Sequence, residues 1–204
     1  MDVAKFRKQP ILGILRGIKA DALSPTLDAI LKSGLATIEI TMNTKGAPSL
    51  IKKCVKQTKG RLTVGAGTVL SMESLKEALD AGASFIVTPV LVKDVTLHCV
   101  KNQIPVFPGA FSPQEIYNCW QAGATMVKVF PAGLLGPKYF KEIKGPFKEI
   151  ELLACGGVTA ENMSDYFLSG ASAISFGASV FKKEWLEKKD FKSIEESIKK
   201  FLVK

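Results

Sequence analysis

The chain has 204 residues, 47% of them hydrophobic and 23% charged, a composition typical of a globular protein with a sizeable core. Its net charge of +9 arises almost entirely from lysines, but these are spread along the chain without a helix-turn-helix or stacking-aromatic pattern, so nucleic-acid binding is not expected. No apolar stretch reaches about 18 residues and the start has no signal-peptide pattern, so we expect no membrane association and a cytoplasmic protein.

Residue types that hold metals or carry out thiol chemistry are sparse. The four cysteines form no C-x-x-C pair, and His98 is the single histidine. A zinc site, a redox motif and a histidine-based triad are therefore not predicted, and we expect no cofactor. Free cysteines are usually buried, so we expect reduced, mostly buried thiols.

Short apolar runs of strand length alternate with amphipathic segments along the whole chain, which is the pattern of repeated β/α units around a parallel sheet. Helix end, glycine and strand recur in the same order, which favours a closed eightfold (β/α) TIM barrel over an open sheet. We expect one compact domain over residues 1–204, ending in a lysine-rich helix at about 182–204. The eight predicted strands are 11–16, 36–42, 61–67, 84–89, 104–109, 125–130, 149–155 and 172–177.

Active sites in such barrels lie at the C-terminal ends of the strands, and one predicted strand carries a lysine there. Side chains alternate along a strand, so Met126, Lys128 and Phe130 share one face. Val127 and Val129 share the other face and suit packing against the outer helices. Lys128 is therefore predicted to point into the barrel.

The same alternation in strand 36–42 sends Glu39 and Thr41 inward. Lys128 and Glu39 inside one barrel have two explanations, a structural ion pair or a catalytic pair. Burial lowers the pKa of an amine and makes it a nucleophile toward carbonyls near neutral pH, whereas a buried ion pair adds little stability. The pattern favours catalysis, and the structural pair remains the alternative.

Four further strand ends offer groups that bind anions. Backbone amides at glycine turns after the last two strands bind phosphate in many barrels, although a tight structural turn has the same sequence. Thr68, in a turn after the third strand, offers a hydroxyl to a ligand carboxylate. Arg16, after the first strand, offers either bidentate carboxylate binding or a salt bridge on the rim. The two late turns contain Cys155, Gly156 and Gly157, and Gly177, Ala178 and Ser179.

Several short motifs occur together in one order along the chain. They are ILRGI (14–18), IEIT (38–41), VGAGTV (64–69), IVTP (86–89), VKVFPA (127–132) and GGV (156–158). Together they resemble the 2-keto-3-deoxy-6-phosphogluconate and 4-hydroxy-2-oxoglutarate aldolase family, over about residues 8 to 182. The ordered set is far more specific than any single motif.

This resemblance implies a class I aldolase that cleaves a 2-keto-3-deoxy-6-phospho sugar acid of the phosphogluconate type, or 4-hydroxy-2-oxoglutarate. The products are pyruvate and an aldehyde, either glyceraldehyde 3-phosphate or glyoxylate. Lys128 then forms the Schiff base with the C2 carbonyl, and Glu39 is the general acid and base. A homotrimer without a metal is also implied. Thr68 would hold the pyruvate carboxylate and Phe130 would wall the site, while Thr41 and Pro89 at neighbouring strand ends are assigned to substrate binding.

Three positions depart from the family pattern where specificity is set. Asn43 stands where the phosphogluconate enzymes have arginine, so Arg16 is the natural substitute as carboxylate ligand. ILRGI together with Asn43 looks more like the 2-keto-3-deoxy-6-phosphogalactonate branch. Cys155 replaces a threonine, and Ala178 stands where serine is common, with Ser179 one place later. The phosphogalactonate epimer and an unphosphorylated 2-oxo acid are therefore alternative substrates. The rival functions are an isomerase-type barrel and a noncatalytic phosphate-binding barrel.

Overall fold

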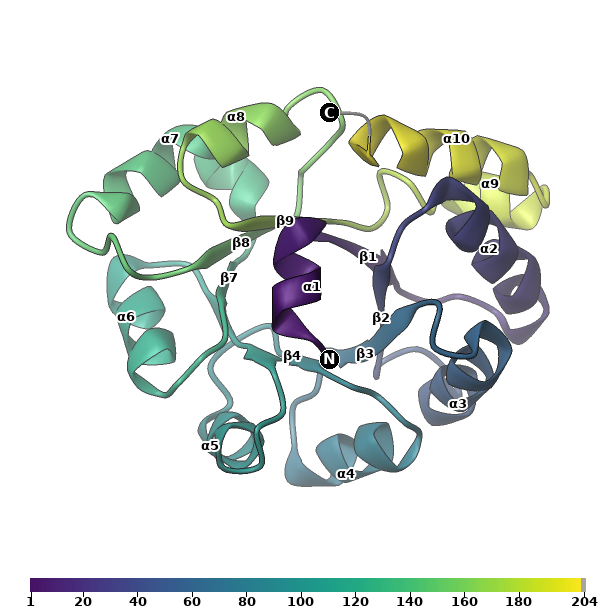
Figure 1. Cartoon of the computed structure of the whole chain (residues 1–204), viewed down its shortest axis with the longest axis horizontal. Coiled ribbons are helices and arrows are strands. Elements are labelled where there is room, and N and C mark those ends of the chain that lie inside the picture. Colours follow the sequence, from purple (N-terminus) through teal and green to yellow (C-terminus); the bar gives the residue numbers. More distant parts are fainter. Residues whose placement is uncertain (203–204) are drawn as a thin grey trace.

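The computed structural model describes residues 1–202, and their strands form one parallel sheet that curves into a nearly closed barrel with helices outside it (Figure 1). The strand order in the sheet is β5-β4-β3-β2-β1-β9-β8-β7-β6. The strands are β1 (Ile11–Leu15), β2 (Thr37–Thr41), β3 (Thr63–Gly67), β4 (Ile86–Val87), β5 (Val106–Phe107), β6 (Gly109–Ala110), β7 (Val127–Val129), β8 (Leu152–Cys155) and β9 (Ala173–Phe176).

The count of nine strands in the described residues differs from the predicted eight because the fifth predicted strand is divided at Pro108. Proline has no N–H to donate to a sheet, so it interrupts the ladder. β5 pairs with β4, whereas β6 pairs with β7. The Pro108 carbonyl still accepts a hydrogen bond from the Lys128 N–H at 2.9 Å. One short segment thus bonds to both ends of the sheet and brings them together.

Helices cover the outside of the sheet and bury its outward-facing side chains. Ile38, Ile40, Val127 and Val129 belong to this outer core, as the predicted alternation requires. Ser71 and Ser112 each begin a helix with a reciprocal capping box. The outer helices are α2 (Ala20–Ser33), α3 (Ala47–Thr58), α4 (Met72–Asp80), α5 (Lys93–Lys101), α6 (Pro113–Gln121), α7 (Ala132–Lys144), α8 (Met163–Leu168), α9 (Lys183–Glu187) and α10 (Phe191–Leu202).

An additional helix, α1 (Val3–Lys8), crosses the end of the barrel where the strands begin (Figure 1). The Asp2 carboxylate caps it by accepting a hydrogen bond from the Lys5 N–H at 3.0 Å. Phe6 is buried, and its ring centroid lies 6.0 Å from that of Phe107. Phe6 therefore fills the barrel interior at the end where the strands begin. The inner core contains Phe6, Leu12, Phe85, Val87, Phe107, Met126, Leu153 and Ala173.

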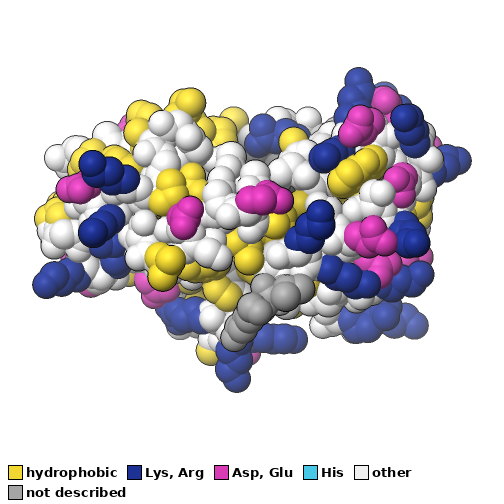
Figure 2. All heavy atoms as spheres, turned by 90° about the horizontal axis from the view of Figure 1, so that it is seen from above, with side chains coloured by type: hydrophobic (Ala, Val, Ile, Leu, Met, Phe, Trp, Pro, Cys, Tyr) yellow, Lys and Arg dark blue, Asp and Glu magenta, His cyan; other side chains and the backbone are white. Residues whose placement is uncertain are grey.

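The lysine-rich end of the chain forms two helices, α9 and α10, where one was predicted. Residues 203–204 of the predicted range lie outside the described residues. Ile194, Ile198 and Phe201 on α10 are buried, and the Phe201 ring centroid lies 4.5 Å from that of Phe176. Lysines and acidic side chains alternate on the exposed side of this region, at the right of Figure 2. The solvated face predicted for this segment is confirmed.

All four cysteines are free and buried, as predicted. Burial raises the pKa of the Cys54 thiol to about 12. No helix of residues 1–202 is long and apolar enough to cross a membrane.

Candidate active site

Lys128 occupies the middle of β7 and is 4% exposed. Met126 lies in the inner core and the two neighbouring valines in the outer core, so the predicted inward direction of Lys128 is confirmed. Its Nζ lies 5.3 Å from the centroid of the Phe130 ring, a cation–π distance. Lys128 is the only lysine of the described residues that is buried.

Glu39 on β2 is 1% exposed, and its Oε2 atom is buried without a hydrogen-bond partner. Burial raises the pKa of Glu39, and the positive charges of Lys128 and Arg16 partly oppose that rise. No direct ion pair joins Lys128 to Glu39 in the described part of the chain. The structural ion pair considered from sequence is therefore absent, and both groups remain available to a ligand.

Gly67 makes room for the Glu39 carboxylate. A Cβ atom at Gly67 would overlap with Oε1 of Glu39, so no larger residue fits without displacing it. The next residue, Thr68, is half-buried and has a φ of 56°, a left-handed conformation that costs free energy outside glycine. Thr68 therefore directly follows the glycine that lies against Glu39, in a backbone conformation that the sequence did not reveal.

A chain of hydroxyl contacts connects the ends of β2 and β1. The Oγ1 atoms of Thr41 and Thr44 lie 3.0 Å apart, and the Gly17 N–H donates to Thr44 Oγ1 at 2.9 Å. Both threonines are buried, so these contacts are shielded from water. Thr41 therefore supports the backbone next to Arg16. Asn43, in the same loop, is exposed.

The two predicted glycine turns line one cavity of about 470 Å³. Gly156 and Gly157 have φ values of 86° and 79°, which turn the chain sharply after β8. The Phe130 ring packs over Gly156 and so connects this cavity with Lys128. The predicted site residues on its wall are Arg16, Phe130, Cys155, Gly156, Gly157, Gly177, Ala178 and Ser179.

Other predicted residues lie outside this cavity wall. Pro89 lines a separate, mainly apolar cavity of about 540 Å³ together with Phe111 and Leu134. Phe130 lines both cavities. Thr68, Thr41 and Glu39 line neither cavity. Phe130 therefore separates the glycine turns from the apolar side of the barrel mouth.

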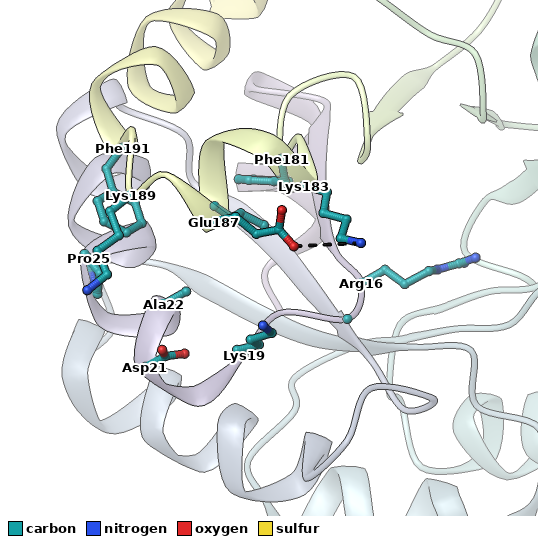
Figure 3. A pocket seen from close by; sticks show the side chains of 12 residues that line it. Arg16, Lys19, Asp21, Ala22, Pro25, Phe181, Lys183, Glu187, Lys189 and Phe191 are labelled. Atoms are coloured by element: carbon teal, nitrogen blue, oxygen red, sulfur yellow. Dashed lines mark ion pairs between the residues drawn. The ribbon is translucent and has the colours of Figure 1, made fainter.

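A third cavity, of about 530 Å³, lies between α2 and α9 and is shown in Figure 3. It shares Arg16, Phe181 and Lys183 with the cavity of the glycine turns. The Arg16 side chain points away from the other labelled residues (Figure 3). The positive charge of Arg16 lowers the pKa of Glu39, so we assign the guanidinium to the barrel mouth. The aliphatic part of the Arg16 side chain borders the third cavity.

Metal-binding side chains do not cluster in the described part of the chain. Within residues 1–202, no group of three or more His, Cys, Asp or Glu side chains could hold a metal ion. The chemistry available at the strand ends is therefore that of an amine, a carboxyl group with a raised pKa and several groups that bind anions.

Comparison with known proteins identifies the family. The family described as KDPG and KHG aldolase matches residues 3–197. The chain belongs to this family. This aldolase is 31% identical over 176 residues to the 2-dehydro-3-deoxy-6-phosphogalactonate aldolase of Escherichia coli, and the match covers 86% of each chain. It is 35% identical over 158 residues to the 2-dehydro-3-deoxy-phosphogluconate aldolase of Pseudomonas aeruginosa, covering 77% of this chain and 70% of that one.

The fold of this aldolase agrees with that of solved relatives. A structure described as native KDPGal superposes with a TM-score of 0.88 at 28% identity, covering 95% of this chain and 92% of the other. The resemblance inferred from the ordered motifs is therefore confirmed, and the chain is an enzyme of the carbon–carbon lyase type.

Two residues near the site were missed in the sequence. Thr44 is buried beneath Gly17, and Lys183 lines the cavity of the glycine turns. The sequence T-M-N-T around Thr44 gave a weak signal, because hydroxyl residues after a strand often bond to the turn that follows. Lys183 gave none, since it belongs to a run of charged residues typical of a solvated face.

Proposed function

We propose that this protein is a class I aldolase in which Lys128 forms a Schiff base with a 2-keto-3-deoxy-6-phospho sugar acid of the phosphogluconate type, or with 4-hydroxy-2-oxoglutarate. The products are pyruvate and an aldehyde, glyceraldehyde 3-phosphate or glyoxylate. The observation that carries the proposal is a buried lysine that has no carboxylate partner although a carboxyl group with a raised pKa faces the same barrel mouth. An electrostatic role alone would favour a direct pair.

The mechanism follows from these two groups. The Lys128 amine adds to the C2 carbonyl and water leaves, giving a protonated imine that accepts electrons. Glu39, directly or through a water, removes the C4 hydroxyl proton, the C3–C4 bond breaks and the aldehyde departs. Glu39 then returns the proton to C3 of the enamine, and hydrolysis of the imine releases pyruvate and the free amine. A carboxyl group with a raised pKa suits both proton transfers.

The remaining residues bind the substrate. Thr68 and Arg16 hold the C1 carboxylate, and the backbone amides of the two glycine turns hold the phosphate. Phe130 excludes water beside the imine. The other positions assigned to substrate contacts at the rim are Thr41, Asn43, Pro89, Cys155, Gly156, Gly157, Gly177, Ala178 and Ser179.

The 2-keto-3-deoxy-6-phosphogalactonate epimer is the second candidate substrate. Cys155 lines the cavity in place of the threonine expected in the phosphogluconate enzymes, and a thiol is a weaker hydrogen-bond donor than a hydroxyl. The similarity to the Escherichia coli enzyme named for phosphogalactonate supports the same possibility. An unphosphorylated 2-oxo acid remains the third candidate, and a noncatalytic phosphate-binding barrel is the remote one.

We also propose a cytoplasmic homotrimer built from single-domain subunits. Each subunit is an eightfold TIM barrel if β5 and β6 count as one strand interrupted at Pro108. Val90, Phe111 and Leu134 are 56%, 41% and 79% exposed and lie around one apolar cavity at the barrel mouth. Exposed apolar side chains that gather in one place favour burial between subunits.

Borohydride trapping tests the proposed chemistry. The protein is incubated with pyruvate and sodium borohydride, and the modified peptide is located by mass spectrometry. We expect the mass increase of a reduced pyruvate imine at Lys128, and none in the Lys128→Arg variant or without pyruvate. Absence of the adduct at Lys128, under conditions that trap another class I aldolase, would overturn the proposal. Cleavage rates on both phosphorylated epimers and on 4-hydroxy-2-oxoglutarate then rank the substrates.

A further inference from the structure

We infer that Lys183 recognises the distal phosphate of the substrate and sets the preference of this aldolase for phosphorylated over unphosphorylated 2-oxo acids. The inference rests on the proposed function and adds a specificity-determining residue to it. It starts from the charges on the wall of the cavity formed by the glycine turns.

This cavity wall carries cations and no anions. Its lining contains Arg16 and Lys183, and no aspartate or glutamate. The other lining groups are apolar side chains, hydroxyls, a thiol and the glycine backbone. A phosphate monoester carries a charge of about −1.5 to −2 near neutral pH, so it complements a wall of this kind. The 470 Å³ of the cavity is enough for a small sugar acid.

The two cations lie at different places on this wall. Arg16 follows β1, and its charge reaches Glu39 at the barrel mouth. Lys183 begins α9, beyond the turn that follows β9. One cation therefore suits the end of the substrate that reacts with Lys128, and the other suits the distal end.

The backbone between β9 and α9 fixes the position of Lys183 relative to the glycine turn. The N–H groups of Val180 and Phe181 both donate to the Gly177 carbonyl, at 3.0 and 2.8 Å. Phe181 is buried, and its ring centroid lies 5.9 Å from that of Phe176. This anchored turn directs Lys183 back over the cavity that Gly177 and Ala178 line.

The present partner of Lys183 is weak enough to be exchanged. Its Nζ lies 3.8 Å from Glu187 Oε1, and the two side chains are 89% and 54% exposed (Figure 3). Exposed ion pairs of this kind add little stability, because water screens them. A phosphate in the cavity offers more charge and more acceptor oxygens than one carboxylate.

The neighbouring lysines are placed differently. Lys182 Nζ lies over the Trp185 ring, 4.3 Å from its centroid, and Lys182 lines a different cavity. Lys188 directly follows α9 as its C-cap residue, is exposed and does not line the cavity of the glycine turns. Lys188 is therefore a matched control, because its loss removes the same charge at the other end of this short helix.

The test compares two substrates that differ only in the phosphate, 2-keto-3-deoxy-6-phosphogluconate and 2-keto-3-deoxygluconate. We measure kcat and KM for the full-length wild type and for Lys183→Ala, Lys183→Arg and Lys188→Ala. For Lys183→Ala we expect KM for the phosphorylated substrate to rise about tenfold, since a charge-assisted contact is lost, and KM for the other to change by less than about twofold. Lys183→Arg should restore most of the difference, and Lys188→Ala should match the wild type.

The outcomes separate this inference from the proposed function. An unchanged ratio of kcat/KM for the two substrates in Lys183→Ala overturns the role of Lys183, as does an equal loss on both. Trapping of pyruvate at Lys128 by borohydride, carried out on the same variants, does not depend on the phosphate. Failure of trapping in the wild type refutes the proposed chemistry, whereas normal trapping with an unchanged ratio refutes the role of Lys183 alone.

Discussion

The two ends of the barrel interior are built from the same strands but filled by opposite kinds of side chain. Where the strands begin, Phe6, Phe85 and Phe107 form an aromatic layer, with Phe85 and Phe107 ring centroids 5.8 Å apart. Where the strands end, Lys128 and Glu39 are buried with an oxygen that has no hydrogen-bond partner. Burial of apolar surface at the first end stabilises the fold, whereas burial of polar groups at the second end destabilises it.

The contrast shows how one short barrel separates stability from chemistry. Because side chains alternate and strands are parallel, a shift of two residues along a strand moves an inward position from the aromatic layer to the site. Substitutions at the two ends should therefore affect different measurements. The following predictions test this, beginning with the largest expected effect.

Glu39→Gln should have the largest effect, a strong fall in kcat without a loss of stability. Loss of the general acid and base should lower kcat by about 100- to 10,000-fold. The pKa of Glu39 is raised above its ordinary value of 4.5, so ionisation of Glu39 costs the folded state free energy as pH rises through the raised pKa. The variant avoids this cost, and its free energy of unfolding relative to wild type should increase as pH rises above 4.5.

Chemical denaturation across that pH range and steady-state kinetics check both parts. Glu149→Gln, an exposed carboxyl group before β8, is the control and should leave kcat unchanged. A stability difference that shrinks as pH rises would contradict the burial argument, because the sign would be reversed.

Phe6→Ala should have the opposite profile. Removing the Phe6 ring leaves a cavity under the aromatic layer and should lower the free energy of unfolding by about 3 to 5 kcal/mol. The kcat of the folded enzyme should change by less than about twofold, since the site lies at the other end. Leu168→Ala, where the side chain is 86% exposed, should cost less than about 0.5 kcal/mol. A large fall in kcat without a loss of stability would show that the two ends are coupled.

Gly65→Ala and Gly67→Ala compare the two ends on a single strand. A Cβ atom at Gly67 overlaps with the Glu39 carboxylate, whereas one at Gly65 overlaps with the Phe85 ring. Gly67→Ala should lower kcat by about 100-fold, because a displacement of about 1 Å is enough to disrupt proton transfer. Gly65→Ala should instead destabilise the fold by about 1 to 3 kcal/mol. Equal effects of the two variants on kcat would remove the distinction.

Thr44→Val should have the smallest effect. It removes the oxygen that accepts the Gly17 N–H, so the backbone next to Arg16 loses its support. We expect KM to rise about fivefold with kcat little changed, because substrate carboxylate binding is weakened. Thr44→Ser keeps the hydroxyl and should behave as wild type. A fall in kcat at constant KM would point instead to a role for Thr44 beside Glu39.

The sequence was sufficient wherever one strand and its alternation decided the outcome. The inward direction of Lys128 and the outward direction of Val127 followed from a period of two. The glycine turn after β8 also lay at the expected strand end, since the positive φ values of Gly156 and Gly157 favour glycine. Family membership followed from motifs that occur in one order.

Features that depend on distant parts of the chain were not predictable. The break at Pro108 lay in a segment that otherwise resembled a strand, and the pairing of each half with a different neighbour is a property of the whole sheet. Helix α1 was missed because it is short. Its contribution to the fold is the contact of Phe6 with Phe107, a residue distant in the sequence. The space that Gly67 leaves for the Glu39 carboxylate was not predicted, because no local pattern reveals which side chain occupies the place of a missing Cβ.

The strand order also has a consequence for how the chain folds. β1 to β5 are neighbours in both sequence and sheet, and so are β6 to β9, whereas β1 pairs with β9 from nearly the opposite end of the chain through Ile11 and Ile174. Contacts between distant residues form late, because a long loop must close first. We therefore expect the two half-barrels to assemble first from local contacts and the β1–β9 pairing to form last.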